Sequence, residues 1–168
     1  MQELPYRIRV AEPDDVAALR ETIVRTLAHP DGQGRRVSYK GAAERGELML
    51  LERHTPRDKS WRVEGFIDYH LRVDDTLTIR DIGSSTDPLN PAAIKQMLHY
   101  VLRTPRLVSA TVKARQDATA WNEILADTPG FEEEGREYRR PHYIIIWRWT
   151  RESEARDQRT AGRGRRRP

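Results

Sequence analysis

The sequence predicts one mixed α/β (α+β) domain over residues 1–150, in which helices flank both faces of a central, mostly antiparallel sheet. Three observations support this fold class. A chain of 168 residues with 37% hydrophobic and 33% charged residues can bury one core beneath a charged surface. Segments of alternating apolar residues are interleaved with apolar stripes at helical spacing. Most strands follow one another as hairpins, but one helix separates two of them, which indicates a parallel crossover there.

The first 46 residues predict a strand, a helix, a loop and a short helix. Alternation over residues 6–11 indicates a half-buried strand. Pro13 and the two aspartates after it are typical of a first helical turn, because proline presets φ and acidic groups face the positive end of the helix. The expected helix then carries apolar residues at helical spacing: Val16, Leu19, Ile23, Val24 and Leu27. Residues 29–38 are polar with glycine and indicate a loop, followed by a short helix over 39–45.

Three strands are expected next, at 48–51, 61–71 and 77–82. The second of them places its apolar residues on one predicted face: Trp61, Val63, Ile67, Tyr69 and Leu71. The second and third strands form a hairpin. Ile82 breaks the alternation that Leu77 and Ile79 begin, which predicts a β-bulge near Arg80 and Asp81.

The second half of the chain predicts two core helices and three more strands. The first helix has one apolar stripe made of Ile94, Met97, Leu98, Val101 and Leu102. Pro105 ends this helix, and residues 107–112 indicate a short buried strand. A helix over 117–126 and a final pair of strands, the last at 142–149, complete the domain. Residues 151–168 consist mainly of Arg, Glu, Gln and Gly, and we expect this tail to be mostly disordered.

Composition excludes several kinds of site. The chain has no cysteine, so it has no disulfide, no thiolate metal ligand and no cysteine nucleophile. Its five histidines are dispersed without the spacing of a metal site, so no metal is expected. No apolar run is long enough to span a membrane, and the first residues lack the basic start and apolar stretch of a signal peptide. We therefore expect a cytoplasmic protein, and a homodimer is compatible with the sequence.

The basic tail carries the excess positive charge. It contains seven arginines against three acidic residues, which accounts for the whole net charge of +4. The body is formally neutral and gives no electrostatic case for binding nucleic acid. The tail alone predicts a weak, salt-sensitive contact with nucleic acid or another acidic surface, and a solvated tail without a partner is the equally weighted alternative.

The stretch from Leu77 to Arg103 is the strongest functional signal. It predicts a strand, a short loop closed by proline, and an amphipathic helix. Backbone N–H groups at a helix start have no partner within the helix, so this arrangement is suited to holding an anion such as a phosphate.

Three segments resemble the GNAT superfamily of N-acetyltransferases, and the resemblance covers about residues 5–150. YRIRVAEPDDVAALRETI resembles the opening strand and helix of the family. DTLTIRDIGSS followed by AAIKQMLHYVLR resembles its central strand and acyl-CoA helix. TVKARQDATAWNEILADTPGFEEEG resembles its last crossover, where a helix ends in Gly-Phe before a hairpin.

The resemblance implies transfer of an acyl group from acetyl-CoA to an amine of a small molecule or peptide. The backbone of Ile82, Gly83 and Ser84 would pair with the pantetheine arm of acetyl-CoA. The loop and helix start that contain Asn90 and Ala92 would face the pyrophosphate. Asp81, late on the central strand, is the implied general base; an ion pair with Arg80 or with a cross-strand arginine is its alternative role.

The loop departs from the pattern of the family. Asp87, Asn90 and Ala92 stand where the family usually has Gln or Arg and two small residues, and glycine there lets the backbone approach the pyrophosphate. A non-catalytic GNAT-like domain that binds a ligand or partner is therefore the alternative function. Three polar residues of the neighbouring strand form a second candidate group: Glu64, Asp68 and His70. They predict either one wall of a substrate cleft or a solvent-facing polar surface.

Overall fold

The computed structural model describes residues 6–22, 25–26, 39–84 and 91–164. Its elements in chain order are β1 (Tyr6–Val10), α1 (Asp15–Thr22), β2 (Arg25–Thr26), α2 (Tyr39–Glu44), β3 (Leu48–Thr55), β4 (Ser60–Leu71), β5 (Thr76–Ser84), α3 (Pro91–Leu102), β6 (Ser109–Arg115), α4 (Thr119–Asp127), β7 (Phe131–Arg139), β8 (His142–Thr150) and α5 (Arg151–Gly164). The strands form one sheet in the order β1-β3-β4-β5-β6-β8-β7, and β2 pairs with β5 outside this path.

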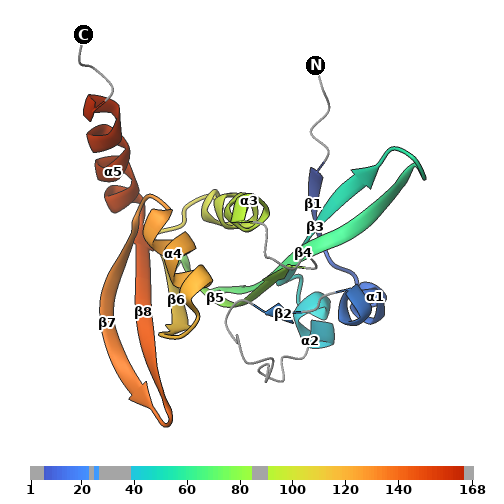
Figure 1. Ribbon diagram of the computed structural model, residues 1–168, viewed down its shortest axis with the longest axis horizontal. Helices are drawn as coiled ribbons and strands as arrows, with labels where there is room; N and C mark the ends of the chain where they lie inside the picture. The colour runs from blue at the N-terminus through green and yellow to red at the C-terminus, as the bar shows by residue number, and fades with distance from the viewer. Residues whose placement is uncertain (1–5, 23–24, 27–38, 85–90, 165–168) are drawn as a thin grey trace.

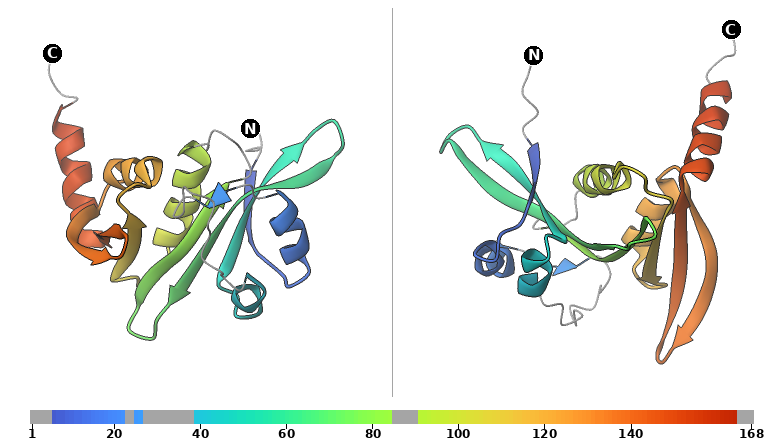
Figure 2. Two further views of the ribbon diagram at one scale, coloured as in Figure 1. Left: turned by 60° about the horizontal axis from the view of Figure 1, so that its bottom comes forward. Right: turned by 180° about the vertical axis from the view of Figure 1, so that it is seen from behind.

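Helices cover both faces of the sheet (Figures 1 and 2). On one face α3 and α4 pack against a large core that includes Ile67, Ile82, Met97 and Trp121. On the other face α1 and α2 cover a smaller core around Leu48, Leu50 and Phe66. The predicted fold class is confirmed: the sheet is mixed and mostly antiparallel, with helices on both faces.

The helix α3 follows its predicted stripe closely. All five residues of the stripe are at most 5% exposed: Ile94, Met97, Leu98, Val101 and Leu102. The parallel crossover is confirmed as well, because β5 and β6 pair in parallel while the other pairs that the structure describes are antiparallel. The α3 helix lies between these two strands in sequence and packs on the sheet that they share.

Two β-bulges shape the centre of the sheet. The predicted bulge on β5 is confirmed at Arg80, since Asp68 and Tyr69 face Asp81 and Ile79 and leave Arg80 as the extra residue. A second bulge, which the sequence did not predict, leaves Glu64 as the extra residue of β4.

The bulge at Glu64 changes which face the β4 side chains occupy. Val63 packs with the core beneath α1 and α2, whereas Ile67 and Tyr69 pack with the core beneath α3. The prediction that the odd-numbered apolar residues of this strand share one face is therefore wrong. An extra residue shifts a period-2 pattern by one position, so alternation cannot continue across it.

The first helix is shorter than its apolar spacing predicted. It ends at Thr22, and Arg25 and Thr26 pair with β5 as an extended segment. Residues 22–26 include a run of β-branched side chains, which favour extended backbone and compete with helical spacing. Ile23, Val24, Leu27 and the predicted loop at 29–38 lie outside the described residues.

The prediction of a mostly disordered tail is wrong for residues 151–164, which form α5. Thr150 caps this helix, because its hydroxyl oxygen accepts a hydrogen bond from the Ser153 N–H at 3.1 Å. Farther along, Asp157 accepts the Gly130 N–H at 2.9 Å and links the helix to the end of α4. Ser153 is buried although it is polar. Both anchors are polar. The segment has no apolar stripe of the kind by which a core helix is recognised in a sequence.

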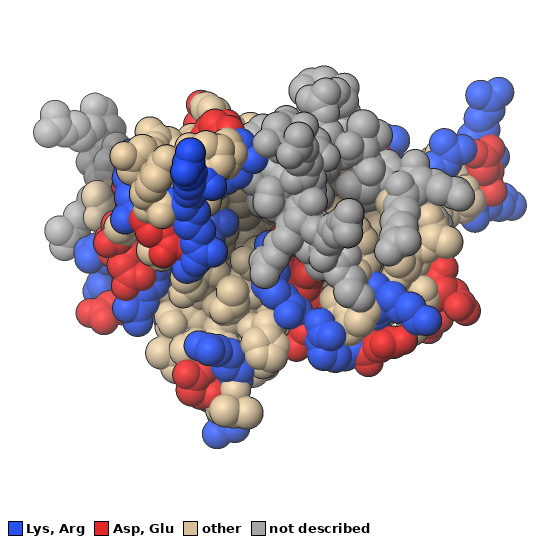
Figure 3. All heavy atoms as spheres, turned by 90° about the horizontal axis from the view of Figure 1, so that it is seen from below, with Lys and Arg blue, Asp and Glu red and all other residues tan. Residues whose placement is uncertain are grey.

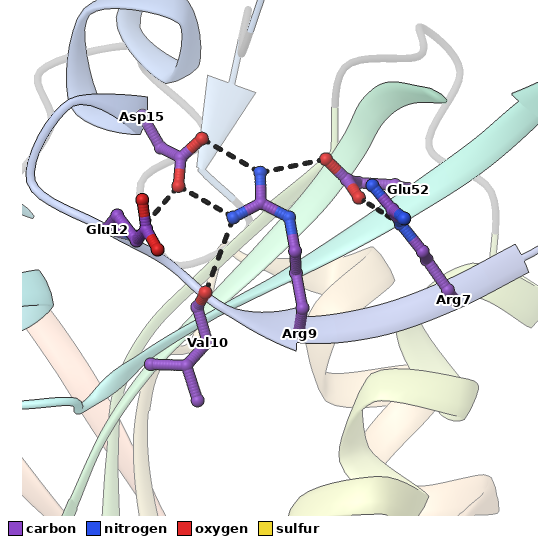
Figure 4. Close-up of polar contacts among 6 residues, drawn as sticks. All are labelled: Arg7, Arg9, Val10, Glu12, Asp15 and Glu52. Carbon is purple, nitrogen blue, oxygen red and sulfur yellow. Dashed lines mark hydrogen bonds and ion pairs between the residues drawn. The ribbon is translucent and has the colours of Figure 1, made fainter. Parts of the chain in front are cut away.

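Arg9 connects β1 with α1 and β3 (Figure 4). Its guanidinium donates to both carboxylate oxygens of Asp15, at 2.7 and 2.8 Å, and to Glu52 at 2.9 Å. Glu52 is only 3% exposed and also accepts from Arg7 at 2.6 Å. The hydrogen bonds to Asp15, which have the larger effect, and to Glu52 raise the pKa of Arg9. The cluster fixes the start of α1 against the sheet.

Charged side chains of both signs are intermixed on the face that carries α1 and α2 (Figure 3). This agrees with a formally neutral body, because neither sign dominates the part of this face that the structure describes. Among the described helices, none combines the length and the apolar character that crossing a membrane requires.

Candidate active site

The sheet opens between its two central strands. The pairing of β5 with β6 runs over four residue pairs, from Thr76 with Ser109 to Ile79 with Val112. Beyond Ile79, β5 continues to Ser84 beside β4, and β6 continues to Arg115 beside β8, but the two strands no longer pair with each other. Figure 1 shows the two halves of the sheet set at an angle about this line. The bulge at Arg80 lies at the point of divergence, where it bends β5.

Residues 81–84 of β5 line the opening. All four residues are buried, and β4 pairs with each of them on one side. Their other side faces the opening toward β6. There β2 pairs antiparallel with the last two residues, Arg25 with Ser84 and Thr26 with Gly83.

Asp81 is buried at the divergence, with 2% of its surface exposed. One carboxylate oxygen, Oδ1, accepts the Ile82 N–H at 2.9 Å, and the other, Oδ2, accepts the Tyr39 hydroxyl at 3.4 Å. Tyr39 begins α2 and packs edge-to-face on Phe66, with ring centroids 5.1 Å apart. Asp81 therefore points to the face covered by α1 and α2.

An ionic network lies beside Asp81. Asp68, the cross-strand neighbour of Asp81, is 1% exposed and pairs with Arg80 at 3.0 Å. The same guanidinium reaches Glu47 at 2.5 Å, and Glu47 also contacts His70 at 2.5 Å. The cross-strand pair places two buried carboxylates on one face of the sheet, and Arg80 neutralises one of them.

The two acids of this network have opposite pKa shifts. Burial raises the pKa of Asp68, although the charge of Arg80 acts against it. Burial would raise the pKa of Glu47 too, but hydrogen bonds from His70, Arg45 and Arg80 together lower it to about 2. Glu47 is thus held as a carboxylate at neutral pH.

The second candidate group has mixed outcomes. The solvent-facing interpretation fails for Glu64 and Asp68, which are 7% and 1% exposed, and holds for the exposed His70. Glu64 pairs with Arg53 at 2.6 Å. The ion pair with Arg80 that the sequence offered as the alternative role of Asp81 is made by Asp68. Tyr39 was missed, because a tyrosine 42 positions from Asp81 carries no signal of contact in the sequence.

Three of the predicted cofactor residues are consecutive at the end of β5. Ile82 directs its side chain into the core beneath α3, so its backbone alone would be available to a ligand. Gly83 and Ser84 follow it at the end of β5, and Ala92 is exposed in the first turn of α3. Asn90 lies outside the described residues.

The opening fits the arm of an acyl-CoA in two respects. The edge of β5 accepts an extended backbone, as its pairing with β2 demonstrates, and the amides of a pantetheine arm can make the same kind of hydrogen bond. The first turn of α3 contains no acidic residue that would repel a phosphate. Within the described residues there is no group of three His, Asp or Glu side chains that could hold a metal.

A pocket of about 560 Å³ lies on the opposite face from Asp81. Its lining includes Ile8, Met49 and Tyr69 of the sheet and Tyr100 and Arg103 at the end of α3. Since Asp81 points toward α2, this pocket does not lead to its carboxylate.

No protein-family model matches the chain, and no curated protein has a similar sequence. Solved structures do match it in fold. An acetyltransferase of the GNAT family from Bacillus cereus superposes with a TM-score of 0.65 at 16% identity, over 86% of this chain and 96% of that one. The aminoglycoside acetyltransferase AAC(6')-Ib, in complex with ribostamycin and coenzyme A, superposes with a TM-score of 0.61 at 13% identity, over 91% of this chain and 97% of that one. A ribosomal-protein-S5-alanine acetyltransferase from Vibrio fischeri superposes with a TM-score of 0.61 at 9% identity, over 89% of this chain and 95% of that one. The chain therefore has the GNAT fold.

Proposed function

We propose that this chain, whose fold is the GNAT fold, is an acyl-CoA-dependent N-acyltransferase that acts on an amine of a small molecule or peptide. One observation carries the proposal: the sheet opens between β5 and β6 directly beside Asp81, a carboxylate that is 2% exposed. An extended thioester substrate and a proton acceptor would meet at that place. Residues 1–150 would form the acyltransferase domain.

Acetyl-CoA would supply an acyl group activated as a thioester. The backbone of Ile82, Gly83 and Ser84 would hold its pantetheine arm along β5, and the segment containing Asn90 and Ala92 would face its pyrophosphate. Asp81 would accept a proton as the amine nitrogen attacks the carbonyl carbon, so that the N–C bond forms, the C–S bond breaks and the thiolate leaves. The hydroxyl of Tyr39 would orient the carboxylate of Asp81 for this transfer.

The carboxylate of Asp81 would be the group that attracts a cationic acceptor. Arg80 and Arg45 already pair with the neighbouring acids, Asp68 and Glu47. An amine that arrives as an ammonium ion would release one proton to solvent before it attacks and its second proton to Asp81 as the N–C bond forms. The structural neighbour AAC(6')-Ib was solved with ribostamycin and with kanamycin, which makes multiply charged amines the first acceptors to test. The Arg-rich tail would add at most a weak contact with an acidic surface.

The alternative is a non-catalytic domain of the same fold. The departures from the glycine-bearing loop support it, and so does β2, which pairs with Gly83 and Ser84 where the pantetheine arm would lie. Calorimetric titration with acetyl-CoA separates the two functions. No heat of binding at millimolar acetyl-CoA would reject the acyltransferase.

If acetyl-CoA binds, the catalytic role of Asp81 is tested with Asp81→Asn. General-base catalysis contributes about 10²–10⁴-fold, so kcat should fall by that factor while the Kd of acetyl-CoA stays unchanged. The measurement is release of free CoA thiol with a panel of amines: an aminoglycoside, a polyamine and a short peptide. Tyr39→Phe is the matched control and should lower kcat much less. Equal activity of Asp81→Asn and the parent protein would remove Asp81 from the mechanism.

A further inference from the structure

We propose that β2 occupies the acyl-CoA edge of β5 in the protein without substrate, and that it must leave before acyl-CoA can bind. This inference rests on the proposed function and names its regulation. The two residues involved are Arg25 and Thr26, which pair with Ser84 and Gly83.

The register shows which edge of β5 is covered. Gly83 and Ser84 pair with β4 through Phe66 and Gly65, and the same two residues pair with β2. A strand has two edges, so β2 must lie on the edge opposite β4. That edge faces the opening toward β6, where β5 and β6 no longer pair. It is also the edge along which a pantetheine arm would extend.

Two partners cannot share this edge. Paired strands lie about 4.8 Å apart, and each residue directs its N–H and C=O to one side only. A pantetheine arm that paired with Gly83 would have to stand where the backbone of Thr26 stands. Binding of the arm and pairing of β2 therefore exclude each other at these two residues.

The contact is short enough to be displaced. It consists of two residue pairs, whereas β4 pairs with β5 over seven. If β2 is paired in most molecules, the apparent Kd of acyl-CoA is raised by the inverse of the fraction in which the edge is open. Acyl-CoA would then select the open molecules, and its binding rate would level off at the rate at which β2 leaves.

Two proline substitutions test this with a built-in control. Successive residues of a strand direct their amides to opposite sides, so one of Arg25→Pro and Thr26→Pro removes an amide that faces β5, and the other removes one that faces away. The variant whose proline removes the amide facing β5, called here the effective proline variant, should bind acetyl-CoA about tenfold more tightly in calorimetry. The other proline variant should have a much smaller effect on the Kd. Thr26→Val keeps the amide and the β-branched shape, so it should bind like the parent protein.

Amide hydrogen exchange, measured without acetyl-CoA, reports on the same contact independently of binding. The β5 amide that faces β2, from Gly83 or Ser84, should exchange faster in the effective proline variant than in Thr26→Val. Tighter binding together with faster exchange would support the inference. Equal acetyl-CoA Kd values in all four proteins, the parent protein and its three variants, would overturn the inference and leave the proposed function intact. Absence of binding in all four would overturn the proposed function and the regulation with it, and exchange would still show whether β2 covers the edge.

Discussion

Gly130 is expected to be a glycine that the fold cannot replace. It follows α4 with φ of +96°, and a Cβ built there would lie 2.5 Å from both Cδ1 and Nε1 of Trp149 and 2.8 Å from the Cβ of Glu154. Trp149 is fully buried and cannot move aside without disturbing the core. Gly130→Ala therefore combines a strained backbone with a steric clash.

The two costs can be estimated separately. A left-handed conformation costs a residue other than glycine about 1–2 kcal/mol, and overpacking a close-packed site costs about 1–3 kcal/mol. We expect Gly130→Ala to lower the free energy of unfolding by roughly 2–5 kcal/mol. For a chain of this size that corresponds to a fall in Tm of about 5–15 °C. Urea unfolding followed by tryptophan fluorescence measures the first quantity and calorimetry the second.

The chain supplies two matched controls for this prediction. Gly46 has φ of +68° with no atom within 4 Å of a built Cβ, so Gly46→Ala isolates the backbone cost. Gly135 has free space and no positive φ, so Gly135→Ala should be neutral or slightly stabilising. The expected order of destabilisation is Gly130, then Gly46, then Gly135. A Gly130→Ala variant no less stable than Gly46→Ala would refute the steric argument.

Three further predictions concern polar contacts. The pKa of Glu47 is lowered from 4.5 to about 2, so its stabilisation of the fold is complete above pH 4.5 and disappears as the pH falls to about 2. In Glu47→Gln, the loss of unfolding free energy between these two pH values, measured by urea unfolding, should be smaller than in the parent protein by up to about 3 kcal/mol. Arg9→Met leaves the buried Glu52 with Arg7 as its remaining arginine among the described residues and should cost about 2–3 kcal/mol in urea unfolding, whereas Arg9→Lys should cost less; a neutral Arg9→Met would contradict this. Asp157→Ala removes the acceptor of the Gly130 N–H and should accelerate amide exchange in α5, and unchanged exchange would show that this hydrogen bond does not hold the helix.

Sequence patterns predicted the parts of the fold in which side-chain periodicity follows burial. The stripe of α3 is an example, since each of its members packs into one core. The bulge at Arg80 could be predicted because Ile82 visibly breaks an apolar alternation. The bulge at Glu64 could not, because Trp61 and Val63 continue the apolar alternation although the backbone no longer does.

The sequence predicted the strand on which most of the candidate site residues lie, but not the contacts of their side chains. The resemblance placed Asp81 and the end of β5 correctly on one strand, because strand position is local in sequence. The contacts of Asp81 with Tyr39 and of Arg80 with Glu47 join residues more than 30 positions apart. The pairing of β2 with β5 was missed for the same reason, and also because Leu27 extends the helical spacing of α1 across it.

The four residue pairs between β5 and β6 also divide the chain into two contiguous stretches. Every strand up to β5 pairs with another strand from the same stretch, and in the second stretch β8 pairs with both β6 and β7. The β3–β4 hairpin pairs residues 5 to 20 positions apart, from Thr55 with Ser60 to Leu48 with Asp68, so its loop closes at low entropic cost. Each of the four pairs of the β5–β6 seam joins residues 33 positions apart and forms only once the α3 crossover has brought the two strands together. We expect the seam to form late in folding, with φ-values near zero for conservative substitutions at Ile79 and Val112 and higher values within the β3–β4 hairpin. A high φ-value at the seam would reverse this order of assembly.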